Sequence, residues 1–148
     1  MKVIVANDHA AIELTLMLIE HMRHRGIEVT HLGVATLESV DYPDMAQAAC
    51  QAFLDEGYDL GLLCCGTGIG ISISANKIDG IRCALPQNTY AAKMAKAHND
   101  ANFIAFGGRV EYADSPVAML DAFLDTPFEA GRHTKRVDKI MALEHLKR

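Results

Sequence analysis

The stretch Leu60-Gly-Leu-Leu-Cys-Cys-Gly-Thr-Gly-Ile-Gly70 decides the fold, because an apolar run of strand length passes directly into a glycine-rich loop. Four more apolar runs of strand length lie at residues 3–6, 27–32, 81–85 and 102–106. Helical patterns lie between and after these runs, at about residues 10–25, 43–56, 69–77, 88–97 and 115–124. Strands that alternate with helices across short connections are typical of a parallel sheet with helices on both faces. The sequence therefore predicts an α/β fold with a five-stranded parallel sheet.

The composition fits one compact domain over residues 1–148, since half of the residues are hydrophobic and can form a full core. The formal net charge is −5, whereas nucleic-acid binders normally carry a basic face. Six of the fourteen Lys and Arg residues nevertheless fall within residues 132–148. A helical pattern at about 134–147 follows Gly131, so we expect a C-terminal segment, about 128–148, to pack on a partner subunit. The predicted ligand is a small anion, such as a phosphate.

The cysteines and the N-terminal residues predict a cytoplasmic location. The four cysteines, Cys50, Cys64, Cys65 and Cys83, form no C-x-x-C pair, so we expect them to be reduced. The apolar start at residues 3–6 is far shorter than the core of a signal peptide or a membrane span. No membrane association is expected.

Polar or glycine-rich residues follow four of the five apolar runs. They are Asp8-His9, Cys65-Gly-Thr-Gly-Ile-Gly70, Gln87-Asn88 and Gly107-Gly108-Arg109. Ligands of open α/β sheets bind beyond the carboxyl ends of the strands. These residues are therefore predicted to meet at one edge of the sheet.

Three alternating glycines, Gly66, Gly68 and Gly70, allow the loop to turn its backbone N–H groups inward. Such a loop at the start of a helix suits an anion or an oxyanion. The spacing differs from the P-loop, and Ile71 stands where a dinucleotide fingerprint has its third glycine, so nucleotide binding is disfavoured. A tight turn with a purely structural role fits these glycines equally well.

Cys65 stands at the mouth of this loop, where oriented amides favour the thiolate form and make the residue a candidate base. The alternative is that Cys65 simply continues the buried apolar run as a small hydrophobic residue. Cys64 suits that alternative better, because adjacent residues of a strand face opposite sides of the sheet.

Structural roles also compete with functional ones at other polar positions. Asp8 could serve only as the cap of a helix, and His9 only as a solvated residue in a turn. The segment His98-Asn99-Asp100 could simply end a helix, since Asn tolerates the left-handed conformation. His21 and His24 are expected to face solvent, and no spacing of His, Cys and carboxylate residues indicates a zinc site.

Arg132 and Arg136 are four residues apart, so within a helix they lie on one face and could grip a phosphate. A solvated helix end is the alternative, since cations are favoured near the C-terminus of a helix. The spacing taken alone favours this alternative.

Taken together, these residues resemble the B-type ribose-5-phosphate isomerase family, which includes allose-6-phosphate and galactose-6-phosphate isomerases. The resemblance spans nearly the whole chain. It rests on Asp8-His9-Ala10, Ser39-Val-Asp-Tyr-Pro43, Cys65-Gly-Thr-Gly-Ile-Gly70, Ala75-Asn-Lys77, His98-Asn-Asp-Ala-Asn102, Gly108-Arg109-Val110 and residues 128–138. It implies a Rossmann-like three-layer α/β/α sandwich that forms a homodimer or a dimer of dimers, with active sites shared between subunits. It also implies an aldose–ketose isomerase that needs no metal or cofactor.

The resemblance implies a role for each candidate residue. Cys65 is the implied base, and Thr67 with the loop amides is implied to stabilise the enediolate oxygen. Asp8 is implied to bind sugar hydroxyls, and the partner's His98 to open the furanose ring. The implied phosphate ligands are His9, Arg109, Arg132 and Arg136, and the implied substrate-positioning residues are Tyr42 and Asn99.

The chain departs from the family pattern at Asn7, Ala11 and Pro86-Gln87-Asn88. Two of these departures flank the expected sugar site, so they bear on which sugar is used more than on the type of reaction. The leading substrate is ribose 5-phosphate. The alternatives are a six-carbon or rarer pentose phosphate, a non-catalytic sugar-phosphate sensor, and a thiol-redox role for Cys64 and Cys65.

Overall fold

A computed structural model describes residues 1–146 and contains one five-stranded sheet in which every neighbouring pair of strands is parallel. The strand order is β2-β1-β3-β5-β4. The strands are β1 (Lys2–Asn7), β2 (Glu28–His31), β3 (Leu60–Cys65), β4 (Cys83–Ala84) and β5 (Phe103–Gly107). All five predicted strands are therefore confirmed.

The fourth strand is shorter than predicted, two residues instead of five, because it lies at the edge of the sheet and pairs with β5 alone. On its outer side, the side-chain amide of Asn76 takes the place of a further strand. Asn76 Oδ1 accepts a hydrogen bond from the Cys83 N–H at 2.9 Å, and Asn76 Nδ2 donates to the Cys83 carbonyl at 2.8 Å. One side chain thus closes this edge.

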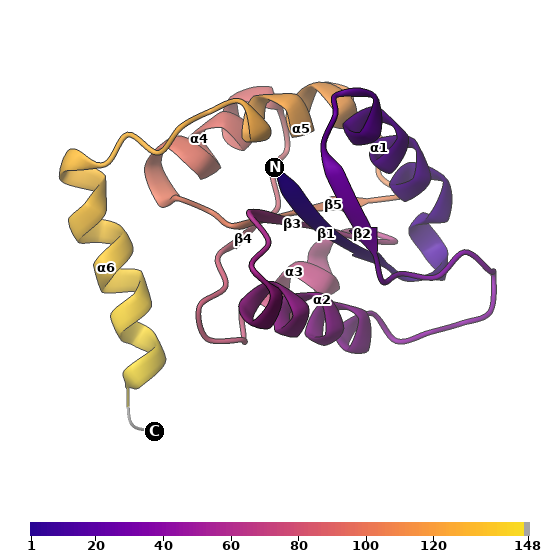
Figure 1. The fold of residues 1–148 in the computed structure, drawn as a ribbon, viewed down its shortest axis with the longest axis horizontal. Coiled ribbons are helices and arrows are strands. Elements are labelled where there is room, and N and C mark those ends of the chain that lie inside the picture. Colours follow the sequence, from indigo (N-terminus) through magenta and orange to yellow (C-terminus); the bar gives the residue numbers. More distant parts are fainter. Residues whose placement is uncertain (147–148) are drawn as a thin grey trace.

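Helices cover both faces of the sheet, which confirms the predicted three-layer α/β/α sandwich (Figure 1). The helices α1 (Ile12–His24), α4 (Thr89–Asn99) and α5 (Pro116–Leu124) pack on one face, and α2 (Tyr42–Glu56) and α3 (Ile69–Ala75) on the other. Alternate strand residues supply the two cores: Val3 and Val5 face the first, Ile4 and Ala6 the second. None of the described helices has the length and apolar character needed to cross a membrane.

The C-terminal segment leaves this sandwich. After the short 3-10 turn Gly131–His133 comes α6 (Thr134–Ala142), which has no buried residue and continues into a second 3-10 turn, Leu143–His145. Figure 1 shows α6 at the opposite end of the molecule from α1. Residues 134–145 agree with the predicted helical segment, whereas Lys147 and Arg148 of the basic cluster lie outside the described residues. Packing of this segment on a partner stays a prediction.

Gly61 on β3 has no room for a side chain, so Gly61→Ala is expected to destabilise the protein. A β-carbon there would lie 2.1 Å from Phe103 Cε1 on the neighbouring strand. Overpacking of this kind costs roughly 1–3 kcal/mol or more of unfolding free energy, which urea unfolding would measure. The matched control is Gly57→Ala, since Gly57 has nothing within 4 Å and a φ of 72°. A loss at Gly61 no larger than the loss at Gly57 would contradict the packing argument.

Candidate active site

The residues that follow β1, β3 and β5 meet at one edge of the sheet, as predicted. The Asp8 N–H donates to the Cys64 carbonyl at 3.1 Å, the Gly108 N–H to the Cys65 carbonyl at 2.8 Å, and the Arg109 N–H to the Gly66 carbonyl at 2.9 Å. These bonds continue the strand pairings past the end of the sheet. They hold the backbones that carry Asp8, Cys65 and Arg109 side by side. These three residues, with His9 and the glycine loop 66–70, are called the Cys65 rim below.

Cys65 and Cys64 face opposite sides of the sheet, so one thiol reaches the glycine loop and the other does not. Cys65 is 3% exposed, and its Sγ accepts a hydrogen bond from the Gly68 N–H at 3.2 Å. Its sulfur therefore contacts a polar group of the loop. Burial raises the pKa of Cys64 to about 12, which keeps that thiol protonated.

Two positions of the glycine loop, Gly68 and Gly70, have no room for a side chain, which agrees with the structural alternative for them. A β-carbon on Gly68, where φ is 75°, would lie 2.6 Å from the Leu85 side chain. A β-carbon on Gly70 would lie 2.5 Å from the ring of Tyr42. Exposed Thr67 accepts a hydrogen bond from the Ile69 N–H at 3.3 Å. The close contact with Gly70 also brings Tyr42 to this end of the sheet.

Asp8 and His9 continue directly from β1 onto the Cys65 rim. Asp8 is 5% exposed, and its Oδ1 accepts a hydrogen bond from the Ala10 N–H at 2.9 Å, so the predicted capping role is present. His9 Nδ1 accepts a hydrogen bond from the Val40 N–H at 3.3 Å. The exposed Arg109 side chain lies against the glycine loop, since a β-carbon on Gly66 would be 3.7 Å from Arg109 Cδ.

A second group of predicted site residues lies at the other end of the sheet. His98 and Asn99 end α4, where Asp100, not Asn99, adopts the left-handed conformation with a φ of 44°. The Glu129 N–H donates to the Ala97 carbonyl at 2.9 Å, which fastens the C-terminal segment beside this helix end. The second group is His98, Asn99, Arg132 and Arg136, called the His98 group below.

The two arginines of the His98 group do not share one continuous α-helix. Arg132 lies in the 3-10 turn Gly131–His133, because Ala130 and Gly131 both have positive φ and turn the chain before α6 begins. Arg136 lies in the first turns of α6. Both side chains are exposed. Their approach to a common phosphate stays a prediction.

The Cys65 rim and the His98 group of one chain are too far apart to share a substrate. β5 begins a few residues after His98 and Asn99 and ends at Gly107, which pairs with Cys65. Its four steps from Phe103 to Gly107 alone span about 13 Å at ~3.3 Å per residue. A site that uses both groups therefore needs a second chain.

His133 and Glu129 join the His98 group, although neither was among the predicted site residues. The rings of His98 and His133 stack with centroids 4.1 Å apart and planes 7° apart. Glu129 Oε2 lies 3.6 Å from His98 Nε2 and 3.8 Å from His133 Nε2. Burial, helped by the charges of His98 and the two arginines, lowers the pKa of His133. The adjacency of His133 to Arg132 was the available signal.

These three residues are the one His/Cys/carboxylate cluster of the described chain with metal-like proximity, since their ligand atoms lie within 4.8 Å of one another. The geometry does not suit a chelate, however. The near-parallel rings of His98 and His133 direct their nitrogen lone pairs in parallel, whereas the lone pairs of metal ligands must converge on one ion. Arg132 Nε also donates to His133 Nε2 at 3.4 Å. The cluster is better described as a stacked, hydrogen-bonded group.

One expected surface residue proves to be paired. His21 was predicted to face solvent, but its Nε2 lies 2.7 Å from Asp121 Oδ1 on α5, and the ring is half-buried. The expectation was wrong because α5 packs beside α1, which only the fold reveals. His24 is exposed, as predicted.

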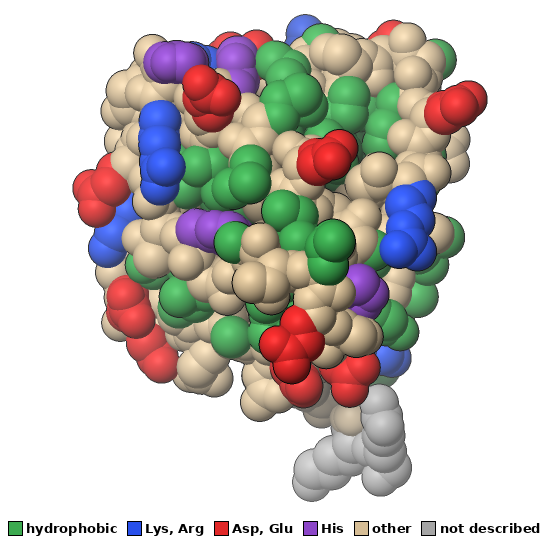
Figure 2. Space-filling view, turned by 90° about the vertical axis from the view of Figure 1, so that its right-hand side faces the viewer, with side chains coloured by type: hydrophobic (Ala, Val, Ile, Leu, Met, Phe, Trp, Pro, Cys, Tyr) green, Lys and Arg blue, Asp and Glu red, His purple; other side chains and the backbone are tan. Residues whose placement is uncertain are grey.

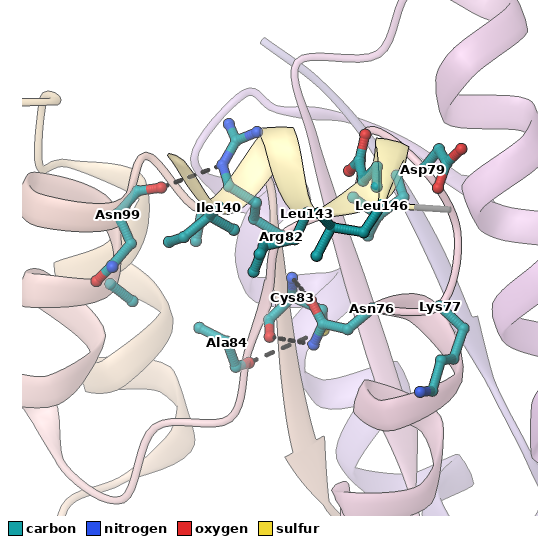
Figure 3. A pocket seen from close by; sticks show the side chains of 14 residues that line it. Asn76, Lys77, Asp79, Arg82, Cys83, Ala84, Asn99, Ile140, Leu143 and Leu146 are labelled. Atoms are coloured by element: carbon teal, nitrogen blue, oxygen red, sulfur yellow. Dashed lines mark hydrogen bonds between the residues drawn. The ribbon is translucent and has the colours of Figure 1, made fainter. Parts of the chain in front are cut away.

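A cavity of about 610 Å³ lies beneath α6, away from the Cys65 rim. Figure 3 shows Ile140, Leu143 and Leu146 on one side of it and Cys83 on the other, while Arg82 reaches toward α6 and its Nη1 donates to Met141 Sδ at 3.2 Å. Because the C-terminal segment stands off the sandwich and exposes Ile140, Leu143 and Leu146, the cavity is suited to packing against protein more than to chemistry. Cys65 does not line it.

The face of the molecule on which α1 and the loop after β2 lie has no cluster of basic side chains among the described residues. Figure 2 shows hydrophobic side chains across the centre of this face, with single Lys, Arg and His side chains scattered around them. A nucleic-acid site would gather its cations on one face. The distribution agrees with the predicted small ligand.

The fold and the Cys65 rim define a Rossmann-like α/β protein with a glycine-rich loop and a thiol at the carboxyl edge of its sheet. The model of the Ribose/Galactose Isomerase family matches residues 3–140, and the chain belongs to this family. The predicted resemblance is therefore confirmed.

Relatives support the same assignment over nearly the full length. The chain is 39% identical over 143 residues to ribose-5-phosphate isomerase B of Escherichia coli, covering 97% of this chain and 96% of the relative. The structure of the Clostridium thermocellum ribose-5-phosphate isomerase B matches with a TM-score of 0.93 and 42% identity, covering 97% of each chain. That of Thermotoga maritima ribose 5-phosphate isomerase matches with a TM-score of 0.90 and 43% identity, covering 95% and 97%.

Proposed function

We propose that the protein interconverts ribose 5-phosphate and ribulose 5-phosphate by moving a proton between C1 and C2 through an enediolate. The family and the names of its relatives support this reaction. The observation that carries it is the Cys65 sulfur, which accepts a hydrogen bond from the Gly68 amide of the glycine loop at the carboxyl edge of the sheet. The reaction transfers hydrogen between adjacent carbons, so it requires no external oxidant and no dissociable cofactor.

At the Cys65 rim, Cys65 acts as the base that takes the proton from C2 and returns it to C1. Removal of this proton leaves negative charge on the substrate oxygen. The inward amides of the loop from Gly66 to Gly70, together with the Thr67 hydroxyl, stabilise that charge. Asp8 binds sugar hydroxyls, which suits a buried carboxylate that keeps one oxygen bound to the Ala10 N–H.

The other half of the site comes from a second copy of the chain, so the active assembly is a homodimer or a dimer of dimers. The span of β5 supports this, because it separates His98 from Cys65 within one chain. The unburied α6 and the cavity beneath it also support it, since they offer apolar surface for a partner. His98 of the partner subunit then opens the furanose ring over the Cys65 rim.

The substrate phosphate is bound from both chains. His9 and Arg109 of the rim supply one side of this phosphate site. The partner's Arg132 and the partner's Arg136 supply the other. Tyr42 at the rim and the partner's Asn99 position the sugar. These phosphate contacts hold the substrate in the site equally in the ground state and in the transition state.

A six-carbon aldose phosphate is the second candidate substrate, since the matching family is described as Ribose/Galactose Isomerase. The thiol-redox alternative is disfavoured, because Cys64 and Cys65 face opposite sides of the sheet. The free state of all four cysteines agrees with the proposed cytoplasmic location.

The proposal is tested by measuring ketose formation from a panel of five- and six-carbon aldose phosphates in deuterated water. We expect the highest kcat/KM with ribose 5-phosphate, together with deuterium in the product, because the base exchanges protons with solvent. A higher kcat/KM with allose or galactose 6-phosphate would overturn the choice of substrate. Binding of these sugars without turnover or deuterium exchange would instead identify a sensor.

A further inference from the structure

The loop over residues 32–41, called the 32–41 loop, folds back over the end of β1 and ends beside the Cys65 rim. The Leu32 N–H donates to the Val5 carbonyl at 2.8 Å, and the Val34 N–H to the Asn7 carbonyl at 3.4 Å. Asn7 is the last residue of β1 and is fully buried, with 0% exposure. This residue is one of the departures from the family pattern.

The Asn7 side chain uses both of its N–H donors and its oxygen on the loop and its surroundings. Its Nδ2 donates to the Asp8 carbonyl at 2.8 Å and to the Val34 carbonyl at 3.0 Å. Its Oδ1 lies 2.6 Å from His31 Nε2, so this imidazole nitrogen must be the donor. Burial, reinforced by Arg23, lowers the pKa of His31 and favours a neutral ring with its hydrogen on Nε2.

The loop packs so closely on this pair that position 33 accepts glycine alone. A β-carbon on Gly33 would lie 2.1 Å from Asn7 Oδ1 and 2.7 Å from His31 Nε2. Asn7 therefore faces the loop and has no surface to offer a sugar. Ala11, the second departure, is likewise buried, against Gly108. Neither residue selects the substrate by direct contact.

The same loop fixes the state of His9. The Val40 N–H can only donate, so the His9 Nδ1 that receives it at 3.3 Å carries no proton. The hydrogen of the neutral ring must then be on Nε2. His9 is thus left with one N–H donor of defined direction.

We infer that Asn7 and His31 are positioning residues, which hold the 32–41 loop so that the Val40 amide fixes His9 as an Nε2–H donor for the substrate phosphate. The inference rests on the proposed function for the role of His9. The phosphate does not react, so its anchor acts equally in the ground state and the transition state. Disturbing the loop should therefore raise KM and leave kcat nearly unchanged.

The first test needs no enzymatic activity. Long-range ¹H–¹⁵N NMR of the intact protein should show His9 with a bare Nδ1 and a protonated Nε2. Val40→Pro removes the amide donor, so we expect a mixture of both tautomers in that variant. A native His9 protonated on Nδ1 would overturn the inference whether or not the protein isomerises any sugar.

The second test measures the phosphate anchor directly. Hydrogen bonds to a charged group are among the stronger ones, so partial loss of this bond should weaken binding about tenfold. Val40→Pro and Asn7→Ala should both raise the Kd of inorganic phosphate and the KM of ribose 5-phosphate by about this factor, with kcat within about twofold. The matched control is Leu37→Pro, since Leu37 lies in the same loop with its side chain 85% exposed.

The outcomes separate the two proposals. Unchanged phosphate affinity in Val40→Pro, with His9 still in its native tautomer, would refute the positioning role. A fall in kcat with unchanged KM would refute it too, because that pattern indicates damage to the chemical step. Failure of the wild-type protein to form ribulose 5-phosphate would instead overturn the proposed function, while the His9 spectrum would still test the loop.

Discussion

Cys65→Ala is expected to lower kcat by about a thousandfold, because general base catalysis typically contributes 10²–10⁴ in rate. The KM should change little, since the phosphate anchors remain. Solvent deuterium should also stop entering C1 of ribulose 5-phosphate. This exchange reports proton transfer alone, because a ketopentose 5-phosphate cannot close into a furanose. Coupled turnover assays and NMR of the exchanged ketose measure the two effects.

Cys64→Ala is the matched control for this variant. Cys64 is the preceding residue, but its side chain lies in the core on the other face of the sheet. Its loss should lower the melting temperature and leave kcat within about twofold. Full activity in Cys65→Ala would remove the proposed base, and equal inactivation of both variants would show that folding, not chemistry, was disturbed.

Two inactive variants are expected to restore activity when they share one dimer. Cys65→Ala disables the rim of its own chain, whereas His98→Ala disables the group lent to the partner. In the mixed dimer, one of the two sites combines an intact Cys65 rim with an intact His98. Heterodimers isolated through two different affinity tags should therefore show about half of the wild-type activity.

Cys65→Ala combined with Asp8→Asn provides the control for this rescue. Both residues belong to the same rim, so each of the two sites in that heterodimer carries one of the substitutions. We expect no recovery of activity. Recovery in this pair, or none in the pair with His98→Ala, would contradict the shared site.

The alternation of apolar runs and helical patterns was enough to predict the layers of the fold and the Cys65 rim. This works because residues that follow parallel strands must meet at one edge. The same rule places His98 at the opposite edge, since it lies at the end of a helix, α4, that returns antiparallel to the strands. Its separation from Cys65 was therefore available from the sequence.

The contacts between distant segments could not be predicted in this way. The stack of His98 on His133 depends on where the C-terminal segment crosses α4. The contact of Asn7 with His31 depends on a loop whose path no periodic pattern records. In both cases the residue types were visible, but their partners are set by the packing of elements, and local preferences carry no information about that.

The Asn76 side chain on the outer edge of β4 has a consequence for solubility. An open strand edge presents free backbone groups on which another chain can add, and this is a common route to fibrils. Here the primary amide already occupies both outward-facing groups of Cys83. The β4 edge is therefore closed to the addition of a strand from another molecule, by a side chain of the same protein.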